Sequence, residues 1–190
     1  MFKIKSIQNK NTANHVALAL TMGISCYYLF QFSTKYYFPS SDFFGFKGLA
    51  EELFNFHLVL SSKRLPVYPF LMGLVATLIP AKKALLYAGI LVSNVSYIGS
   101  IYLIHKIGQR IGIKYSILVS WFFAFSTLSL YLGTQPLPEA TILFLILLSF
   151  YVKSDKLSLG FSGLASLTRF DAALAVVANF PKIIMEKKKR

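Results

Sequence analysis

Residues 84–104 form a run of 21 consecutive positions without a single charged side chain. An α-helix of that length spans about 30 Å, the thickness of the hydrocarbon core of a bilayer. Backbone amides in hydrocarbon must find their hydrogen-bond partners within the protein, which favours helices. Shorter apolar runs lie on either side. The sequence therefore predicts an all-α, polytopic transmembrane helix bundle, with spans at residues 16–32, 84–104, 115–133 and 138–152.

The composition fits the same class of protein. Hydrophobic residues make up 55% of the chain and charged residues 14%, whereas about 25% of a soluble domain is charged. A disordered chain, a coiled coil and a disulfide-rich secreted module are thereby excluded. Cys26 is the only cysteine, so no intrachain disulfide can form and no Cys/His spacing indicates a metal site.

The positive charge predicts an orientation rather than a nucleic-acid partner. Twenty Lys and Arg oppose seven Asp and Glu, and many of the bases lie in short loops between apolar runs. Such loops face the cytoplasm. Thirteen of the 20 bases fall in four segments: 1–15, 105–114, 153–156 and 182–190, the last of which includes the basic tail 186–190. We therefore expect both termini to be cytoplasmic. The main partner is expected to be the bilayer.

This orientation constrains the end of the chain. Residues 157–185 must then form a pair of short helices with a break near Arg169 and Asp171, with one continuous span as the alternative. At the other end, the lysines before residue 16 also suit a cleaved signal peptide, but no small-x-small cleavage site follows.

The segment between the first two spans is the first outer loop, residues 33–65. It carries an apolar stripe at helical spacing, which predicts an amphipathic helix lying in the membrane interface; the stripe is Phe46, Leu49, Ala50, Leu53 and His57. Residues 66–80 are apolar but short and contain three prolines. They predict a juxtamembrane or re-entrant helix that does not cross.

Five ionisable residues lie in or beside the predicted outer surface: Asp42, Arg64, Glu139, Arg169 and Asp171. Each has an ordinary structural interpretation. Asp42 and Glu139 suit the starts of helices, Arg64 can reach lipid headgroups, and Arg169 can pair with Asp171 where charge in an apolar stretch is costly. The functional interpretation is a carboxylate-and-guanidinium site at the membrane surface, in which the arginines bind phosphate.

The order of the motifs resembles a known superfamily. Asp42 opens the outer-loop segment DFFGFKGLA, Arg64 opens RLPVYP before the short helix, Pro138-Glu139 precedes a further apolar run, and GLASLTR ends at Arg169. This set resembles the GT-C superfamily of membrane glycosyltransferases, which includes protein O-mannosyltransferases, aminoarabinose transferases and GPI mannosyltransferases. The resemblance covers residues 18–190 and matches the N-terminal half of such an enzyme.

The resemblance implies transfer of a sugar, a hexose such as mannose, from a polyprenyl- or dolichyl-phosphate carrier to an acceptor on the outer or lumenal face. Asp42 falls at the family's catalytic acid, although the second adjacent acid of several subfamilies is missing. Arg64, Tyr68 and Arg169 are expected to bind the lipid phosphate of the donor, and Glu139 is the other outer-face acid.

The resemblance leaves the cofactor and the class of protein open. No cofactor or metal ligand is predicted, and use of a divalent metal stays open because family members differ. A second polypeptide that supplies the C-terminal half is an expected partner. The alternative is a non-catalytic small membrane protein: a degenerate relative, an assembly partner or a transporter-like bundle.

Overall fold

The computed structural model describes residues 2–35, 39–57 and 64–179, and within these ranges every regular element is a helix. The basic tail 186–190 and the segment 58–63 of the outer loop lie outside the described residues. The helices are α1 (Phe2–Lys35), α2 (Ser41–Phe54), α3 (Val67–Ala76), α4 (Ala84–Arg110), α5 (Ser116–Phe125), α6 (Thr127–Thr134), α7 (Glu139–Tyr151) and α8 (Asp155–Ser166). After α8, η1 (Phe170–Ala172) opens a last helical segment, Phe170–Asn179.

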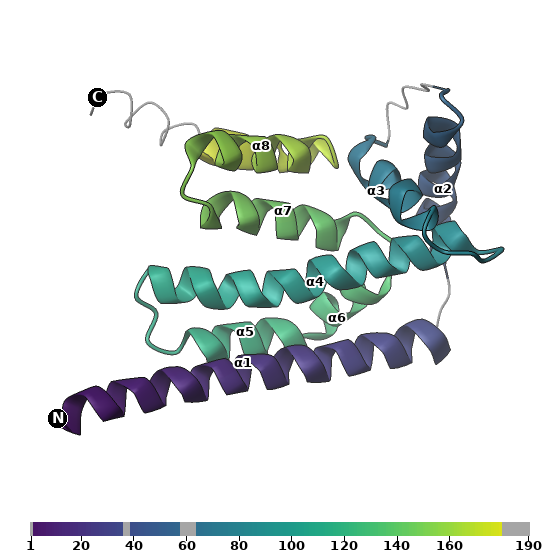
Figure 1. Ribbon diagram of the computed structural model, residues 1–190. Helices are drawn as coiled ribbons and strands as arrows, with labels where there is room; N and C mark the ends of the chain where they lie inside the picture. The colour runs from purple at the N-terminus through teal and green to yellow at the C-terminus, as the bar shows by residue number, and fades with distance from the viewer. Residues whose placement is uncertain (1, 36–38, 58–63, 180–190) are drawn as a thin grey trace.

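The long helices lie side by side, as Figure 1 shows, with α1, α4, α7 and α8 stacked in order and α5 and α6 between α1 and α4. α4 is central, because it packs on α1, α3, α5, α6 and α7. α2 and α3 sit together at one end of the stack. We call this the α2–α3 end; the opposite end holds the 111–115 turn and the 152–154 turn.

Two helices are long and apolar enough to cross a membrane: Thr12–Ser33 within α1, and α4. A third crossing exists if α5 and α6 count as one span, but they meet at an angle of 63°. The sequence predicted a single span over residues 115–133. It is broken because Ser126 caps α6: its backbone is extended, and its Oγ accepts from the Ser129 amide at 3.2 Å. α3, α7 and Phe170–Asn179 are apolar but shorter.

Small and hydroxylated side chains join the central helices. Ser96 on α4 and Thr141 on α7 share a hydrogen bond of 3.1 Å, and Ser93 donates to the Leu137 carbonyl at 3.0 Å. Gly99 lies directly under the Phe144 ring of α7. In hydrocarbon, small residues allow close helix packing and hydroxyl groups bond across the interface. These contacts make α4 and α7 the most closely joined pair.

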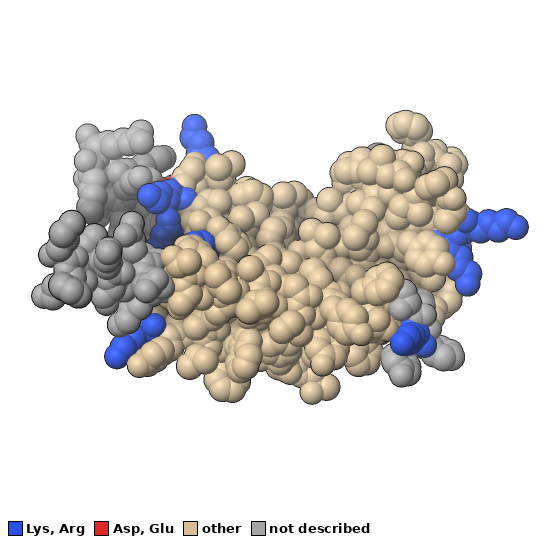
Figure 2. Space-filling model, turned by 60° about the horizontal axis from the view of Figure 1, so that its bottom comes forward, with Lys and Arg blue, Asp and Glu red and all other residues tan. Residues whose placement is uncertain are grey.

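The surface is divided into a broad apolar belt and two charged ends. In Figure 2, Lys and Arg gather at the two ends of the molecule and the visible face between them carries none. Large apolar side chains in this belt are exposed on several helices, including Leu20 at 61%, Phe122 at 79% and Leu128 at 70%. An exposed apolar area of this extent marks a surface that contacts another apolar phase. Together with the two or three membrane-length helices, it indicates a membrane-associated protein.

Candidate functional site

Asp42 and Arg64, which are 22 positions apart, meet at the α2–α3 end. The Arg64 Nη2 donates to Asp42 Oδ1 at 3.1 Å. Asp42 lies in the first turn of α2, where a carboxylate is favoured by the helix dipole. Arg64 lies two residues before Pro66, which suits the start of α3. The first turn of one helix and the approach to the next are thus joined by one ion pair.

The Arg64 guanidinium is held on two further sides. Its Cζ lies 5.4 Å from the centroid of the Phe46 ring, within the range of a cation–π contact. It also fills the space beside Gly45, where any Cβ would overlap it. The Arg64 side chain is 27% exposed and the Asp42 side chain 69%. The base is therefore fixed and the acid is mostly in solvent.

A second group of ions lies at the same end. Arg169 Nη1 lies 3.0 Å from Glu139 Oε1, and Arg169 Nε lies 3.3 Å from Asp171 Oδ1. Glu139 is the first residue of α7, and Arg169 occupies the break between α8 and Phe170–Asn179. The other Glu139 oxygen, Oε2, is buried without a hydrogen-bond partner among the described residues. One acid of this group therefore keeps an unused acceptor.

The two groups are connected through the backbone. The Val67 amide at the start of α3 donates to the Leu167 carbonyl after α8 at 3.3 Å. Beside this bond lies a small cavity of about 250 Å³, lined by Leu65, Thr168, Arg169, Phe170 and Asp171. Two residues of the second ion group, Arg169 and Asp171, line this cavity, and Leu65, which directly follows Arg64 in the sequence, lines it as well. All five candidate ionisable residues are thereby gathered at one end of the protein.

The two ends differ in charge balance. Among residues with described side chains, the α2–α3 end has six bases and five acids; these are Lys35, Lys47, Arg64, Lys82, Lys83 and Arg169 against Asp42, Glu51, Glu52, Glu139 and Asp171. The opposite end has five bases and one acid, namely Lys106, Arg110, Lys114, Lys153 and Lys156 against Asp155. One end is therefore nearly neutral and the other strongly basic.

Tyr68, which the resemblance led us to expect at the lipid phosphate, lies in the protein interior. Its side chain is fully buried. The hydroxyl group lies 3.2 Å from both the Gly89 carbonyl and Ser93 Oγ on α4, and the ring packs edge-on against Phe46 at 5.4 Å between centroids. In this arrangement Tyr68 holds α3 on α4 and supports Phe46, which in turn contacts Arg64.

The amphipathic helix α2 has its apolar face covered by protein. Its buried residues are Phe43, Phe46, Leu49 and Ala50, and α2 packs on α3. The predicted stripe extended to His57, which lies beyond the end of the helix and is exposed. Helical spacing alone does not show whether a stripe faces lipid or a neighbouring helix, and here much of it faces protein.

Sequence reasoning connected neither Gly45 nor Phe46 with Arg64, and it placed Phe46 only in the apolar stripe of the amphipathic helix. The available signal was their spacing from Asp42, because residues three and four positions apart share a helix face. Across the described ranges, no group of three His, Cys, Asp or Glu side chains is placed to hold a metal ion. Comparison with known proteins finds no matching family model, no matching curated protein and no matching solved structure.

Proposed function

We propose that the chain is a multi-pass membrane protein whose α2–α3 end faces the outside or lumen and whose opposite end faces the cytoplasm. The charge balance supports this, because loops rich in Lys and Arg stay on the cytoplasmic side. The arrangement of the last two segments fits it as well. α8 runs toward the α2–α3 end and the segment to Asn179 runs back, with Asn179 bonded to Ser149 of α7 at 3.1 Å.

In this orientation the proposed activity is glycosyl transfer from a polyprenyl-phosphate sugar, with a hexose such as mannose as the transferred group. The observation that carries it is the 3.1 Å contact between Arg64 and Asp42. A fixed guanidinium at a membrane surface suits a phosphate, and an exposed carboxylate next to it suits an acceptor proton. The chain would act as the enzyme or as its N-terminal catalytic half, with a second polypeptide supplying the rest.

The chemistry begins with an exchange of partners. The donor's phosphate takes the place of the Asp42 carboxylate on Arg64, since both are anions that accept from the same N–H groups. This frees Asp42. The acceptor oxygen then attacks the first carbon of the sugar while the carbon–oxygen bond to the phosphate breaks. The bonding electrons leave with the phosphate, whose charge Arg64 stabilises, and the acceptor proton passes to Asp42.

The second ion group is proposed to orient the sugar. Arg169 lines the cavity and adds a positive charge there, and its ion pair with Glu139 holds the guanidinium in place. One observation favours the non-catalytic alternative, in which the chain is a small membrane scaffold. Both arginines already have carboxylate partners. In this alternative the ion pairs have a purely structural role and hold α2, α3, α7 and α8 together.

A transfer assay separates the two functions. Membranes that contain the chain, alone and together with candidate partner polypeptides, are supplied with labelled polyprenyl-phosphate mannose, and label in the acceptor fraction is measured. The glycosyltransferase proposal expects transfer that is lost with Asp42→Asn and kept with Glu51→Gln, an exposed acid of the same helix. If no combination transfers the label and the chain does not bind the donor, the scaffold interpretation replaces the enzyme.

A further inference from the structure

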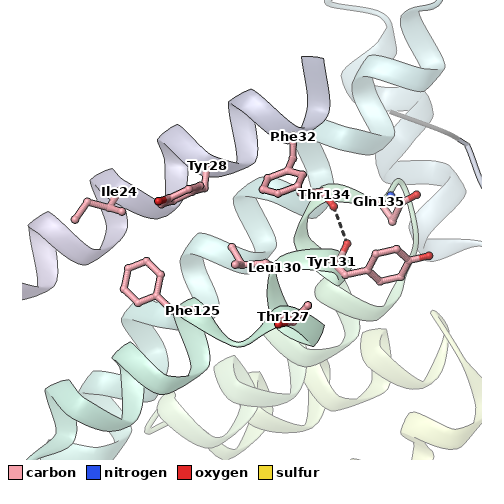
Figure 3. Close-up of a pocket in the computed structure, with 9 residues that line it drawn as sticks. All are labelled: Ile24, Tyr28, Phe32, Phe125, Thr127, Leu130, Tyr131, Thr134 and Gln135. Atoms are coloured by element: carbon pink, nitrogen blue, oxygen red, sulfur yellow. Dashed lines mark hydrogen bonds between the residues drawn. The ribbon is translucent and has the colours of Figure 1, made fainter. Parts of the chain in front are cut away.

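A groove of about 750 Å³ lies between α1 and the bent pair α5–α6, away from the ion pairs. Figure 3 shows Ile24, Tyr28 and Phe32 along α1 facing Phe125 and Leu130 from the other wall. The groove exists because Ser126 ends α5 and turns α6 by 63°, so that the pair cannot follow α1 along its whole length. It opens in the apolar belt, where the surroundings are hydrocarbon if the protein spans a bilayer.

The polarity of the groove changes along its length. Ile24 and Phe125 lie at one end in Figure 3, and Thr134 and Gln135 lie at the other. Gln135 directly follows α6 and lies at the level where α7 begins, near the α2–α3 end. An amide that donates and accepts suits the ester carbonyls of a lipid, which lie where the hydrocarbon region begins. The groove is thus apolar inside the belt and polar near the membrane surface.

A cation lies above the polar end. Lys35, the last residue of α1, is exposed and follows Ile24 by 11 residues, which is about three helical turns. Three turns place Lys35 on the same side of α1 as Ile24 and Tyr28. An ammonium group at that place attracts the phosphate of an anionic lipid. Along the groove, a cation, polar groups and apolar walls follow one another, which is the order of the phosphate, the ester groups and the acyl chain of a lipid.

The length of the groove selects the kind of lipid. From Lys35 to Ile24 the helix rises about 16 Å, close to half of the roughly 30 Å hydrocarbon core. One acyl chain of a leaflet lipid has that depth, whereas a polyprenyl chain is much longer than one leaflet. We propose that the groove binds one chain of an anionic glycerophospholipid of the leaflet at the α2–α3 end, with the lipid phosphate at Lys35. This site does not depend on Asp42 or Arg64.

Native mass spectrometry of the purified chain in mild detergent tests the proposal, with phosphatidylglycerol and phosphatidylcholine as probes. We expect one retained phosphatidylglycerol per chain, and less phosphatidylcholine. Ile24→Trp places a large ring in the groove and should abolish retention. Leu20→Trp is the matched control, because Leu20 is exposed on the same helix one turn outside the groove. Thr127→Phe, on the opposite wall, is a second blocking variant.

The headgroup part has its own variant. Lys35→Gln should remove the preference for phosphatidylglycerol over phosphatidylcholine while one lipid is still retained, and Lys47→Gln on α2 should leave the preference unchanged. Four results would overturn the proposal: no retained lipid, equal loss in Leu20→Trp and Ile24→Trp, full displacement of phosphatidylglycerol by polyprenyl phosphate, or occupation of the groove by a transmembrane helix that excludes lipid. The third result would assign the groove to the sugar donor.

Discussion

Arg64 donates to Asp42 from a position that is more enclosed than that of the acid. The guanidinium lies against the Phe46 ring and beside Gly45, and its side chain is 27% exposed against 69% for Asp42. In the proposed reaction, an incoming phosphate would meet an enclosed cation and displace an exposed carboxylate. Exchange of this kind requires little rearrangement of the protein, which is the property a preorganised anion site needs.

Asp42→Asn should separate turnover from donor binding. The amide has nearly the size of the carboxylate but cannot take the acceptor proton, so turnover should fall by about a hundredfold or more. Donor affinity should be kept or rise, because the amide competes less than the carboxylate for Arg64. Initial rates and equilibrium binding of a labelled polyprenyl-phosphate sugar measure the two quantities. Glu51→Gln is the control, since Glu51 lies on the same helix and pairs only with exposed Lys47 among the contacts found. Wild-type turnover by Asp42→Asn would remove the proposed base.

Gly45→Ala should weaken donor binding with little effect on folding. A Cβ at Gly45 would overlap the Arg64 guanidinium, and the flexible end of that side chain can shift to make room. Gly48→Ala, one turn later on α2, meets nothing within 4 Å, and should leave binding unchanged. Arg64→Lys is expected to be intermediate between wild type and Arg64→Ala, because the charge stays but the two-pronged geometry is lost. Equal donor binding by Gly45→Ala and Gly48→Ala would show that the position of Arg64 is unimportant.

Tyr68→Phe should lower stability rather than affinity. The substitution removes a hydroxyl that contacts Gly89 and Ser93 in a buried site, and a hydrogen bond of this kind is worth about 1 kcal/mol. Thermal unfolding in detergent measures the loss. Tyr87→Phe, at a position that is 50% exposed, should show none. If Tyr68→Phe instead weakens donor binding at unchanged stability, the direct phosphate contact expected from the sequence is the better interpretation.

Gly99→Ala should separate α4 from α7. The added methyl group would overlap the Phe144 ring in the closely packed interface between these helices, and overpacking of this kind costs about 1–3 kcal/mol. Gly160→Ala on α8 meets nothing within 4 Å and should be neutral or slightly stabilising, because alanine favours helix. A lower unfolding temperature for Gly99→Ala alone is the expected result. Equal unfolding temperatures would mean that Phe144 moves aside at no cost.

Cysteine labelling tests the orientation. In a Cys26→Ser background, which removes the only native thiol, Ser41→Cys should react with a membrane-impermeant reagent added from the outside. Ile113→Cys, in the turn between α4 and α5, should react only from the cytoplasmic side. Both native residues are exposed. Labelling of position 41 exclusively from the cytoplasmic side would reverse the proposed topology and remove the outer-face site.

The helical class and the main apolar segments follow from the sequence because burial in hydrocarbon requires long uncharged runs. α4 begins at Ala84 and continues past residue 104 to Arg110, the basic residue of its last turn, which suits a helix C-terminus. The helix break at Ser126 could not be predicted from the sequence. A single serine in an apolar run is compatible with a continuous helix, and only the three-dimensional structure shows that it caps a new one.

The candidate ionisable residues could be predicted because charges stand out in an apolar sequence. Charges are rare in this chain, so each one near an apolar run is conspicuous, and the sequence selected Asp42, Arg64, Glu139 and Arg169 on that ground. It also predicted the contact between Arg169 and Asp171, but not the ion pairs that Arg64 makes with an acid 22 positions earlier and Arg169 with one 30 positions earlier. Nor could it distinguish Tyr68 as a buried contact of α4, since tyrosine suits both a membrane surface and a core.

The bond from the Val67 amide to the Leu167 carbonyl has a consequence for synthesis. Its two residues are separated by a hundred positions, and a contact of such high sequence separation forms late. When α2 and α3 leave the ribosome, the turn after α8 does not yet exist, so the cavity beside Arg169 has no second wall. The cavity is therefore completed only after nearly the whole described chain has been made, so an unfinished polypeptide lacks it.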